Sequence, residues 1–265
     1  MQFIGFGDGS DGDLHITTNT EEVAIASICS GTAGTAVLTV DAALGFAANQ
    51  IVTIWQTRGD GGAGAIPGTW ERAQVLSYVG TTLTLRTNLV NTYTTGGSIN
   101  RAQVKVCKQY SSVTIDVGCS YSPQYWDGNK YGIMDFLCSG IFINNGTLLG
   151  TGRGFRGGAP GGDDAAFSGE GTRSPSLQNN ANPDGNGGGS QHVSSVGGGN
   201  ATTVTGGEGT VGSEDGNATL SLLIMGGGGG ACGENSSSGA GGNGGCVASI
   251  DVRTYLQGVN GVIFN

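Results

Sequence analysis

The residue types best suited to catalysis are acidic pairs and histidines in polar, glycine-rich stretches. Two carboxyl pairs occur, Asp163–Asp164 and Glu214–Asp215, and the histidines are His15 and His192. Glycoside hydrolysis needs two carboxylates that face each other across a sugar, whereas adjacent acidic residues in polar loops are explained more simply by solvation. The sequence also lacks the GxSxG turn that carries a nucleophilic serine. We therefore expect no catalytic residue and no conventional enzyme activity.

A cluster of aromatic residues is better suited to binding. Tyr121, Tyr125, Trp126 and Tyr131 lie in the segment SYSPQYWDGNKYG. If these rings are exposed, they can stack on sugars or anchor a protein partner, because aromatic side chains offer a large contact area at low entropic cost. If they are buried, they cap the core between two parts of the chain. The sequence leaves both alternatives open.

Polar inserts between glycine runs are the other candidates for recognition, since binding residues are often displayed on loops. The inserts are Thr172–Pro183, Gln191–Val196, Ala201–Thr205 and Glu234–Ser238. Plain connectors would have the same composition. Together with the aromatic cluster, they give a set of candidate receptor-binding residues: Tyr125, Trp126, Tyr131, Arg173, Gln191, His192, Glu234 and Asn235.

The sequence gives little indication of a metal or cofactor. Asp8, Ser10, Asp11 and Asp13 offer oxygen ligands, but their spacing does not match a calcium loop and favours a solvated turn. GxGxxG occurs several times, yet no helix is expected after any copy, as a dinucleotide site requires. We expect no metal site and no cofactor.

The cysteines permit two interpretations. No CxxC motif is present and histidine is scarce, so a structural zinc site is not expected. Proximity suggests a disulfide between Cys107 and either Cys119 or Cys138, and another between Cys232 and Cys246. Small buried thiols are the alternative.

Charge excludes two classes of partner. The net charge is −9 with 11 Lys+Arg, which does not supply the basic surface that nucleic acid or an anionic membrane requires. No run of 18 apolar residues indicates a membrane-spanning helix. The start of the sequence lacks the pattern of a secretory signal. Either a signal was removed and a new Met supplied, or the protein is made in a cytoplasm and leaves it inside a larger particle.

The secondary-structure elements that position these candidate residues are predicted to be β-strands throughout. Residues 1–20 read as an Asp/Gly-rich leader, residues 21–110 as a β-sandwich or barrel-like module, and residues 111–150 as a short stacked β segment that carries the aromatic insert. Alternating Val, Ile and Thr between Gly and Asn turns is typical of strands. The expected strands are Val23–Ser30, Thr35–Asp41, Ile51–Gln56, Arg72–Tyr78, Thr82–Arg86, Ala102–Lys108, Ser112–Val117 and Phe136–Leu149.

Residues 151–265 form a separate glycine-rich domain that contains more than half of the 54 glycines. In GAGGNGGC glycine recurs with a three-residue period, which suits extended threefold helices of the polyglycine II type that pack backbone against backbone. A flexible linker is the alternative. An apolar strand at Leu220–Met225 and the strand-like finish CVASIDVRTYLQGVNGVIFN argue against it, and the latter must pair to avoid aggregation.

Two segments resemble proteins of known class. FGDGSDGDLHITTNT, Phe6 to Thr20, resembles the opening of tailed-phage tail-fibre and tail-tip proteins. GTLLGTGRGFRGG, Gly146 to Gly158, is similar to a motif that opens glycine-rich domains in bacterial surface proteins and phage fibres. The glycine-rich part resembles phage adhesins built from polyglycine II helices. The resemblance implies a homotrimer that sits in the virion tail, contacts other tail proteins and binds a host-surface glycan or protein.

We therefore expect a structural or adhesive virion protein that attaches a phage to its host through many weak contacts. The first alternative is a bacterial extracellular surface or filament subunit that polymerises by strand exchange through its apolar C-terminus. The second is a tailspike enzyme that depolymerises polysaccharide.

Overall fold

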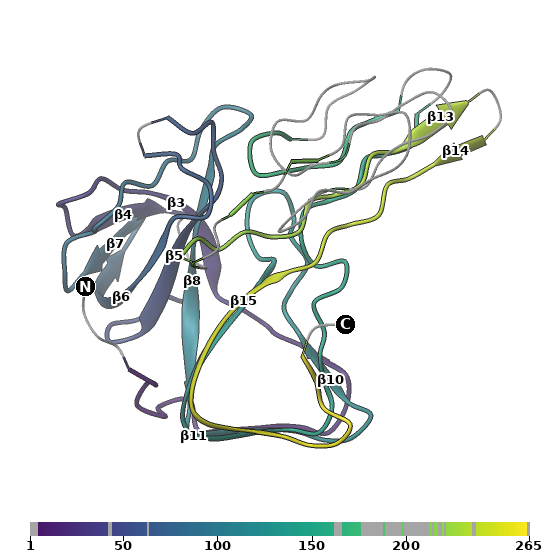
Figure 1. Ribbon diagram of the computed structural model, residues 1–265. Coiled ribbons are helices and arrows are strands. Elements are labelled where there is room, and N and C mark those ends of the chain that lie inside the picture. Colours follow the sequence, from purple (N-terminus) through teal and green to yellow (C-terminus); the bar gives the residue numbers. More distant parts are fainter. Residues whose placement is uncertain are drawn as a thin grey trace.

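The computed structural model describes residues 5–41, 44–62, 64–161, 166–175, 188, 198, 212–213, 215–216, 219, 221–234 and 237–263. These residues form β-strands and no helix, which confirms the predicted all-β fold class. Figure 1 shows a barrel on the left, stacked strands at the bottom and a glycine-rich bundle at the upper right.

Six antiparallel strands close into a barrel. Their order is β8-β3-β4-β7-β6-β5, and β5 pairs back with β8. Alternate side chains point inward, so fully buried residues such as Leu38, Ile54 and Leu83 fill the interior. The strands overlap the predicted ranges: β3 (Ala26–Ser30), β4 (Val37–Val40), β5 (Ile51–Arg58), β6 (Trp70–Val79), β7 (Thr82–Leu85) and β8 (Arg101–Tyr110).

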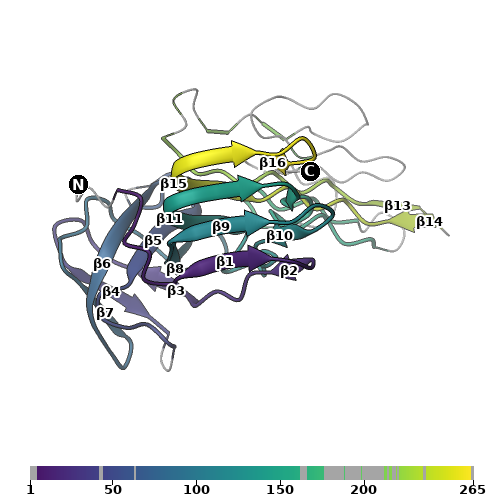
Figure 2. The same ribbon diagram turned by 90° about the horizontal axis from the view of Figure 1, so that it is seen from below.

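Beside the barrel, parallel strands stack as the rungs of a β-solenoid, seen almost edge to edge in Figure 2. Each rung contains a first strand of 4 to 12 residues, a corner and a second strand of 2 or 3 residues, and the second strands form a sheet of their own. The rungs are β1–β2 (Asp13–Ile16, Thr20–Glu21), β9–β10 (Ser112–Ile115, Ser120–Ser122), β11–β12 (Ile133–Asn144, Thr147–Leu148) and β15–β16 (Val247–Gln257, Val262–Ile263).

The first and second rungs, and the third and fourth, are far apart in sequence, yet all four share one register. Leu14 aligns with Val113, Val113 with Phe142, and Phe142 with Tyr255. These side chains stack in a column within a second core, where Phe142 and Tyr255 pack edge to face at 5.1 Å. The barrel is thus an insertion between the first and second rungs, and the glycine-rich segment is an insertion between the third and fourth.

The glycine-rich bundle is held by backbone hydrogen bonds with a three-residue period. The amides of Gly226 and Gly229 donate to the carbonyls of Gly245 and Gly242, respectively. On another side of the same segment, the amides of Gly228 and Ala231 donate to Glu170 and Phe167. One extended segment therefore bonds to neighbours in different directions, which is the pattern expected of packed threefold glycine helices.

Glycine is required where these backbones meet. A Cβ placed on Gly228 would lie 2.0 Å from the carbonyl oxygen of Arg156, and one on Gly244 would lie 1.9 Å from that of Gly226. The bundle ends in the β13–β14 hairpin (Cys232–Glu234, Ser237–Gly239), which projects away from the solenoid in Figure 1.

Two predictions of local structure need correction. The expected strand at Leu220–Met225 is not a strand over its described residues 221–225, although Leu223 and Met225 are buried against the barrel. Its apolar pattern reflects this packing. The six cysteines are unpaired, so the predicted disulfides are wrong, and Cys29, Cys107 and Cys138 are buried thiols.

Candidate functional site

The aromatic insert lies where the solenoid, the barrel and the bundle meet. Its loop follows β10 and is fixed at both ends by backbone hydrogen bonds, from Trp126 to Arg153 and from Gly132 to Gln124. The Asp127 carboxylate closes the tip of the loop by accepting the amides of Asn129 and Lys130 at 2.8 Å. These contacts give the insert a defined shape without regular secondary structure.

Tyr131 lies at the end of the insert in a left-handed conformation, with φ of +74°. The side chain of Gln103, on barrel strand β8, accepts the Tyr131 amide at 2.7 Å and donates to its carbonyl at 3.1 Å. This pair of bonds stabilises an otherwise unfavourable conformation. The Tyr131 ring is half-buried and has the Lys130 ammonium 5.4 Å from its centroid.

Tyr125 presents its ring to solvent, with 53% of the residue exposed. The Arg153 guanidinium carbon lies 3.6 Å from the ring centroid, so one face of the phenol is stacked on a cation. Arg153 also forms an ion pair with Glu21 of β2, and its Nε is buried without a hydrogen-bond partner. The site thus combines an exposed aromatic side chain, a largely buried cation and a half-exposed carboxylate.

Trp126 points the opposite way and is buried in the junction core with Phe155 and Met225. Its indole N–H donates to Glu170 Oε2 at 2.9 Å. Glu170 also accepts from Arg156, at 2.7 Å to Oε1, and pairs with Arg58 of β5 at 3.3 Å. This Trp126–Glu170 cluster therefore ties the insert, the bundle and the barrel together.

The charges of the cluster are mutually dependent. Burial acts to raise the pKa of Glu170, but hydrogen bonds from Arg156 and the charges of Arg58 and Arg156 outweigh it and hold the pKa below its usual value. Burial lowers the pKa of Arg58 to about 10, despite the opposing effect of Glu170. Both groups are ionised at neutral pH, so each is the counter-ion that the other needs in this buried position.

The structure separates the other candidate residues. Arg173 is exposed and its guanidinium lies over Gly61 of the barrel. Glu234 belongs to the β13–β14 hairpin at the end of the bundle. Gln191, His192 and Asn235 lie outside the described residues. None of these positions tests the receptor-binding assignment, which stays a prediction.

Sequence reasoning missed Glu21, Arg153 and Glu170. Glu21 and Arg153 are more than a hundred residues apart, and so are Arg58 and Glu170. The insertions between rungs make the partners distant in sequence, and the packing of the rungs, the barrel and the bundle brings them together. The sequence contains one indication of these ion pairs. Charged residues are scarce, so each of them has few possible partners of opposite charge.

The acidic leader has structural partners. Asp8 accepts the Ser10 amide at 2.9 Å in a tight turn, in agreement with the predicted turn, and Asp11 pairs with Lys108 at 2.7 Å. Across the described part of the chain, no group of three or more His, Cys, Asp or Glu side chains is arranged to hold a metal ion. The same described residues contain no helix long and apolar enough to cross a membrane.

Comparison with known proteins identifies only structural neighbours. No protein-family profile and no curated protein matches the chain. The solved structures it resembles include tailspike gp49 of Pseudomonas phage LKA1, with 16% identity, TM-score 0.26 and coverage of 48% of this chain and 24% of that one. The gp54 tailspike of Acinetobacter baumannii phage AP22, in complex with capsular saccharide, has 13% identity, TM-score 0.29 and coverage of 52% and 28%.

A third neighbour is tailspike gp61 of Pseudomonas phage phi297, with 17% identity, TM-score 0.27 and coverage of 54% and 24%. The chain thus spans about a quarter of the length of these structures. All three are phage tailspikes. A tailspike enzyme is the second alternative function that the sequence left open. The prediction that the chain is not an enzyme is overturned by these neighbours and is withdrawn.

Proposed function

We propose that the chain is a host-attachment component of a phage tail and that it binds a glycan on the host surface. The observation that supports this function most directly is the exposed Tyr125 ring, which is held against Arg153 on a rigid junction. A sugar has apolar C–H faces and a rim of hydroxyls. The open side of the phenol suits the former, and the half-exposed Glu21 carboxylate suits the latter.

The proposal includes the assembly that makes weak sites effective. A single aromatic site of this kind binds weakly, and several copies on one particle raise the overall affinity through effective concentration. We infer a homotrimer attached to other tail proteins in the virion. The leader and junction segments that resemble phage fibres support this inference.

A second candidate is a bacterial surface or filament subunit that polymerises through its C-terminus. The observation that favours it is the exposure of apolar residues on the last rung, where Leu256, Val262 and Ile263 are 40–50% exposed. Such a strand can add to a second molecule. The mass of the native particle in solution separates the candidates: a discrete trimer supports the tail protein, and an open-ended series of polymers supports the filament.

The test of the site is adsorption of the labelled chain to a panel of bacterial strains and to polysaccharide extracted from them. Tyr125→Ala should weaken binding to a responsive strain about tenfold or more, as expected for an aromatic hot spot worth above 1 kcal/mol. Tyr125→Phe should keep most of the binding because it keeps the ring.

The matched control is Val79→Ala, which removes an exposed apolar side chain on the barrel. Equal binding by Tyr125→Ala and Val79→Ala would show that this site is not the contact. If the unmodified chain adsorbs to none of the strains, the function itself is contradicted. Release of reducing sugar from a bound polysaccharide would add hydrolysis to attachment.

A further inference from the structure

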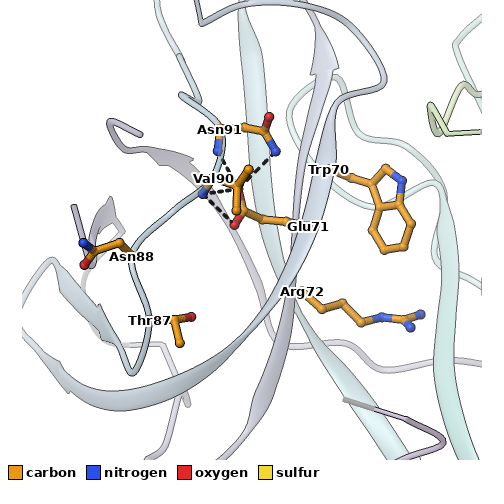
Figure 3. A pocket seen from close by; sticks show the side chains of 7 residues that line it. All are labelled: Trp70, Glu71, Arg72, Thr87, Asn88, Val90 and Asn91. Carbon is orange, nitrogen blue, oxygen red and sulfur yellow. Dashed lines mark hydrogen bonds between the residues drawn. The ribbon is translucent and has the colours of Figure 1, made fainter. Parts of the chain in front are cut away.

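A groove of about 480 Å³ lies on the barrel, away from the aromatic insert. It runs between the first residues of β6 and the loop that follows β7. Figure 3 shows Trp70 and Arg72 on one side of β6, and Thr87 and Asn88 on the other. The lining residues therefore come from both sides of the strand. Its lining residues are Trp70, Glu71, Arg72, Thr87, Asn88, Val90 and Asn91.

The loop that forms one wall is fixed by a buried carboxylate. Glu71 accepts the amides of Val90, at 3.0 Å, and Asn91, at 2.9 Å, and it also accepts the Asn91 side-chain amide and the Tyr93 hydroxyl. Figure 3 marks the bonds to Val90 and Asn91. A wall held by this many bonds is formed before any ligand arrives, which lowers the entropic cost of binding.

The two charged residues of the groove are occupied by protein partners. Glu71 is buried, with 7% of the residue exposed, and its carboxylate is bonded to the loop. The Arg72 guanidinium donates to Asp135 at 2.7 Å and to the Ser249 side chain at 2.8 Å, and it pairs with Asp251. Since these charges are neutralised within the protein, the groove does not select an ionic ligand.

What the groove offers a ligand is an indole, an isopropyl group and small polar side chains. Trp70 is half-buried, with its N–H directed to the Ser221 carbonyl, so its ring is fixed. Val90 is 62% exposed, and Thr87 and Asn88 are exposed beside it. A fixed aromatic ring with a few hydroxyl and amide groups is a typical lining for a polar ligand without charge.

We propose that this groove binds a neutral oligosaccharide, as a second glycan subsite separate from Tyr125. The inference rests on the proposed function, because it assigns a substrate class to the same attachment. Two subsites on one chain raise the overall affinity for a long polysaccharide, since binding at one holds the chain near the other. Uronic-acid oligosaccharides should bind less well, because the Arg72 charge is already paired.

Acrylamide quenching of tryptophan fluorescence provides a direct readout. Trp55 and Trp126 are buried at 1% and 3% exposure, whereas Trp70 is partly exposed and should therefore account for most of the quenching. The probes are neutral hexose and N-acetylhexosamine oligosaccharides, with uronic-acid oligosaccharides of equal length for comparison. A saturable loss of quenching with a neutral oligosaccharide, absent with the acidic ones, is the expected result.

Two variants test the location without removing Trp70. Asn88→Trp fills the groove and should weaken binding of that neutral oligosaccharide at least tenfold, measured by calorimetry. Val90→Ala should weaken it about threefold, while the control Val79→Ala leaves it unchanged. Unaltered affinity in Asn88→Trp, or no protection of Trp70 by any neutral oligosaccharide, overturns the inference.

Adsorption to bacterial cells distinguishes this failure from failure of the proposed function. If the chain adsorbs to a strain and Tyr125→Ala reduces adsorption while no oligosaccharide protects Trp70, the function stands and the groove is not a subsite. If the chain adsorbs to no strain but the groove binds a neutral oligosaccharide and Asn88→Trp abolishes that binding, the subsite stands and the attachment function falls.

Discussion

The barrel and the glycine-rich bundle achieve order in opposite ways. In the barrel, side chains such as Leu38, Ile54 and Leu83 are fully buried, and the backbone pairs only with strands on either side. In the bundle, the backbone itself forms the contact surface: the segment around Gly228 bonds to neighbours in several directions. One region is specified by which side chains are present, and the other by where side chains are missing.

This difference determines which substitutions each region tolerates. A side-chain core accepts a smaller or reshaped apolar residue at a moderate cost, because neighbouring side chains adjust. A backbone-packed bundle has no side chain that can move aside, so a single added methyl group displaces the main chain. Mutations should therefore have graded effects in the barrel and nearly all-or-none effects in the bundle.

The largest effect is expected from Gly241→Ala. A Cβ at this position would lie 1.9 Å from the carbonyl oxygen of Gly229, and the Gly241 amide also bonds to Gly158. The segment must separate from two neighbours, which should destabilise the bundle by more than about 4 kcal/mol. Hydrogen exchange should show rapid exchange at Gly229 and Gly244 while barrel amides remain protected.

The matched control is the adjacent residue. Gly242 is exposed, has no positive φ, and a Cβ there would meet nothing within 4 Å. Gly242→Ala should therefore change stability by no more than about 0.5 kcal/mol. If the two variants exchange at the same rate, the bundle is not packed backbone to backbone, and the comparison with the barrel fails.

The second effect concerns the cluster that joins the two regions. Glu170→Ala leaves Arg58, with 3% of its side chain exposed, without its carboxylate, and it removes the acceptor of the Trp126 indole. Loss of one partner from a buried ion pair typically costs about 3–5 kcal/mol. We expect earlier unfolding of the junction, measured as a red shift of tryptophan fluorescence at a lower urea concentration, because all three tryptophans lie in or against the junction core.

Asp11→Ala is the control for this substitution. Its carboxylate pairs with Lys108, but both side chains are about one-third exposed, and such pairs contribute up to about 1 kcal/mol. A junction that unfolds at the same urea concentration in both variants would mean that the Trp126–Glu170 cluster does not hold the bundle to the barrel.

The two regions were also predictable to different degrees. The alternation of Val, Ile and Thr indicated all six barrel strands, because local side-chain patterns determine them. The solenoid rungs were only partly visible: Ser112–Val117 was expected, but β1 lies within the expected leader. Its pairing with β9 bridges about a hundred residues, and no local pattern encodes such a partner.

The candidate site shows the same limit. The aromatic cluster in residues 121–131 was found from composition, and the alternatives of exposed and buried rings were both open. In the structure each alternative holds for a different ring: Tyr125 is exposed and Trp126 is buried. The deciding partners, Arg153 and Glu170, come from the bundle, so the outcome depends on long-range packing that the sequence of the insert does not contain.

A smaller loss of stability is expected at acidic pH. The pKa of Glu170 is held below its usual value in the folded state, so its contribution to stability is complete above about pH 4.5 and decreases as the pH falls through the folded-state pKa. Glu170→Gln keeps the shape but does not titrate, so the unmodified chain should lose more stability than the variant between pH 5 and about pH 3. Urea midpoints at these pH values, followed by tryptophan fluorescence, measure the difference; parallel curves would contradict it.

The smallest effect is expected from Ile54→Val. This substitution tests the comparison most directly, because it removes about as much volume from the barrel as Gly241→Ala adds to the bundle. Ile54 is fully buried, and Ile54→Val deletes one methylene at a typical cost of about 0.5–1.5 kcal/mol. The barrel should unfold at a slightly lower temperature, with its hydrogen-exchange pattern preserved, and the control Val79→Ala should match the unmodified chain. A loss as large as that of Gly241→Ala would mean that the barrel core is as intolerant as the bundle. The distinction between order from side chains and order from their absence would then no longer hold.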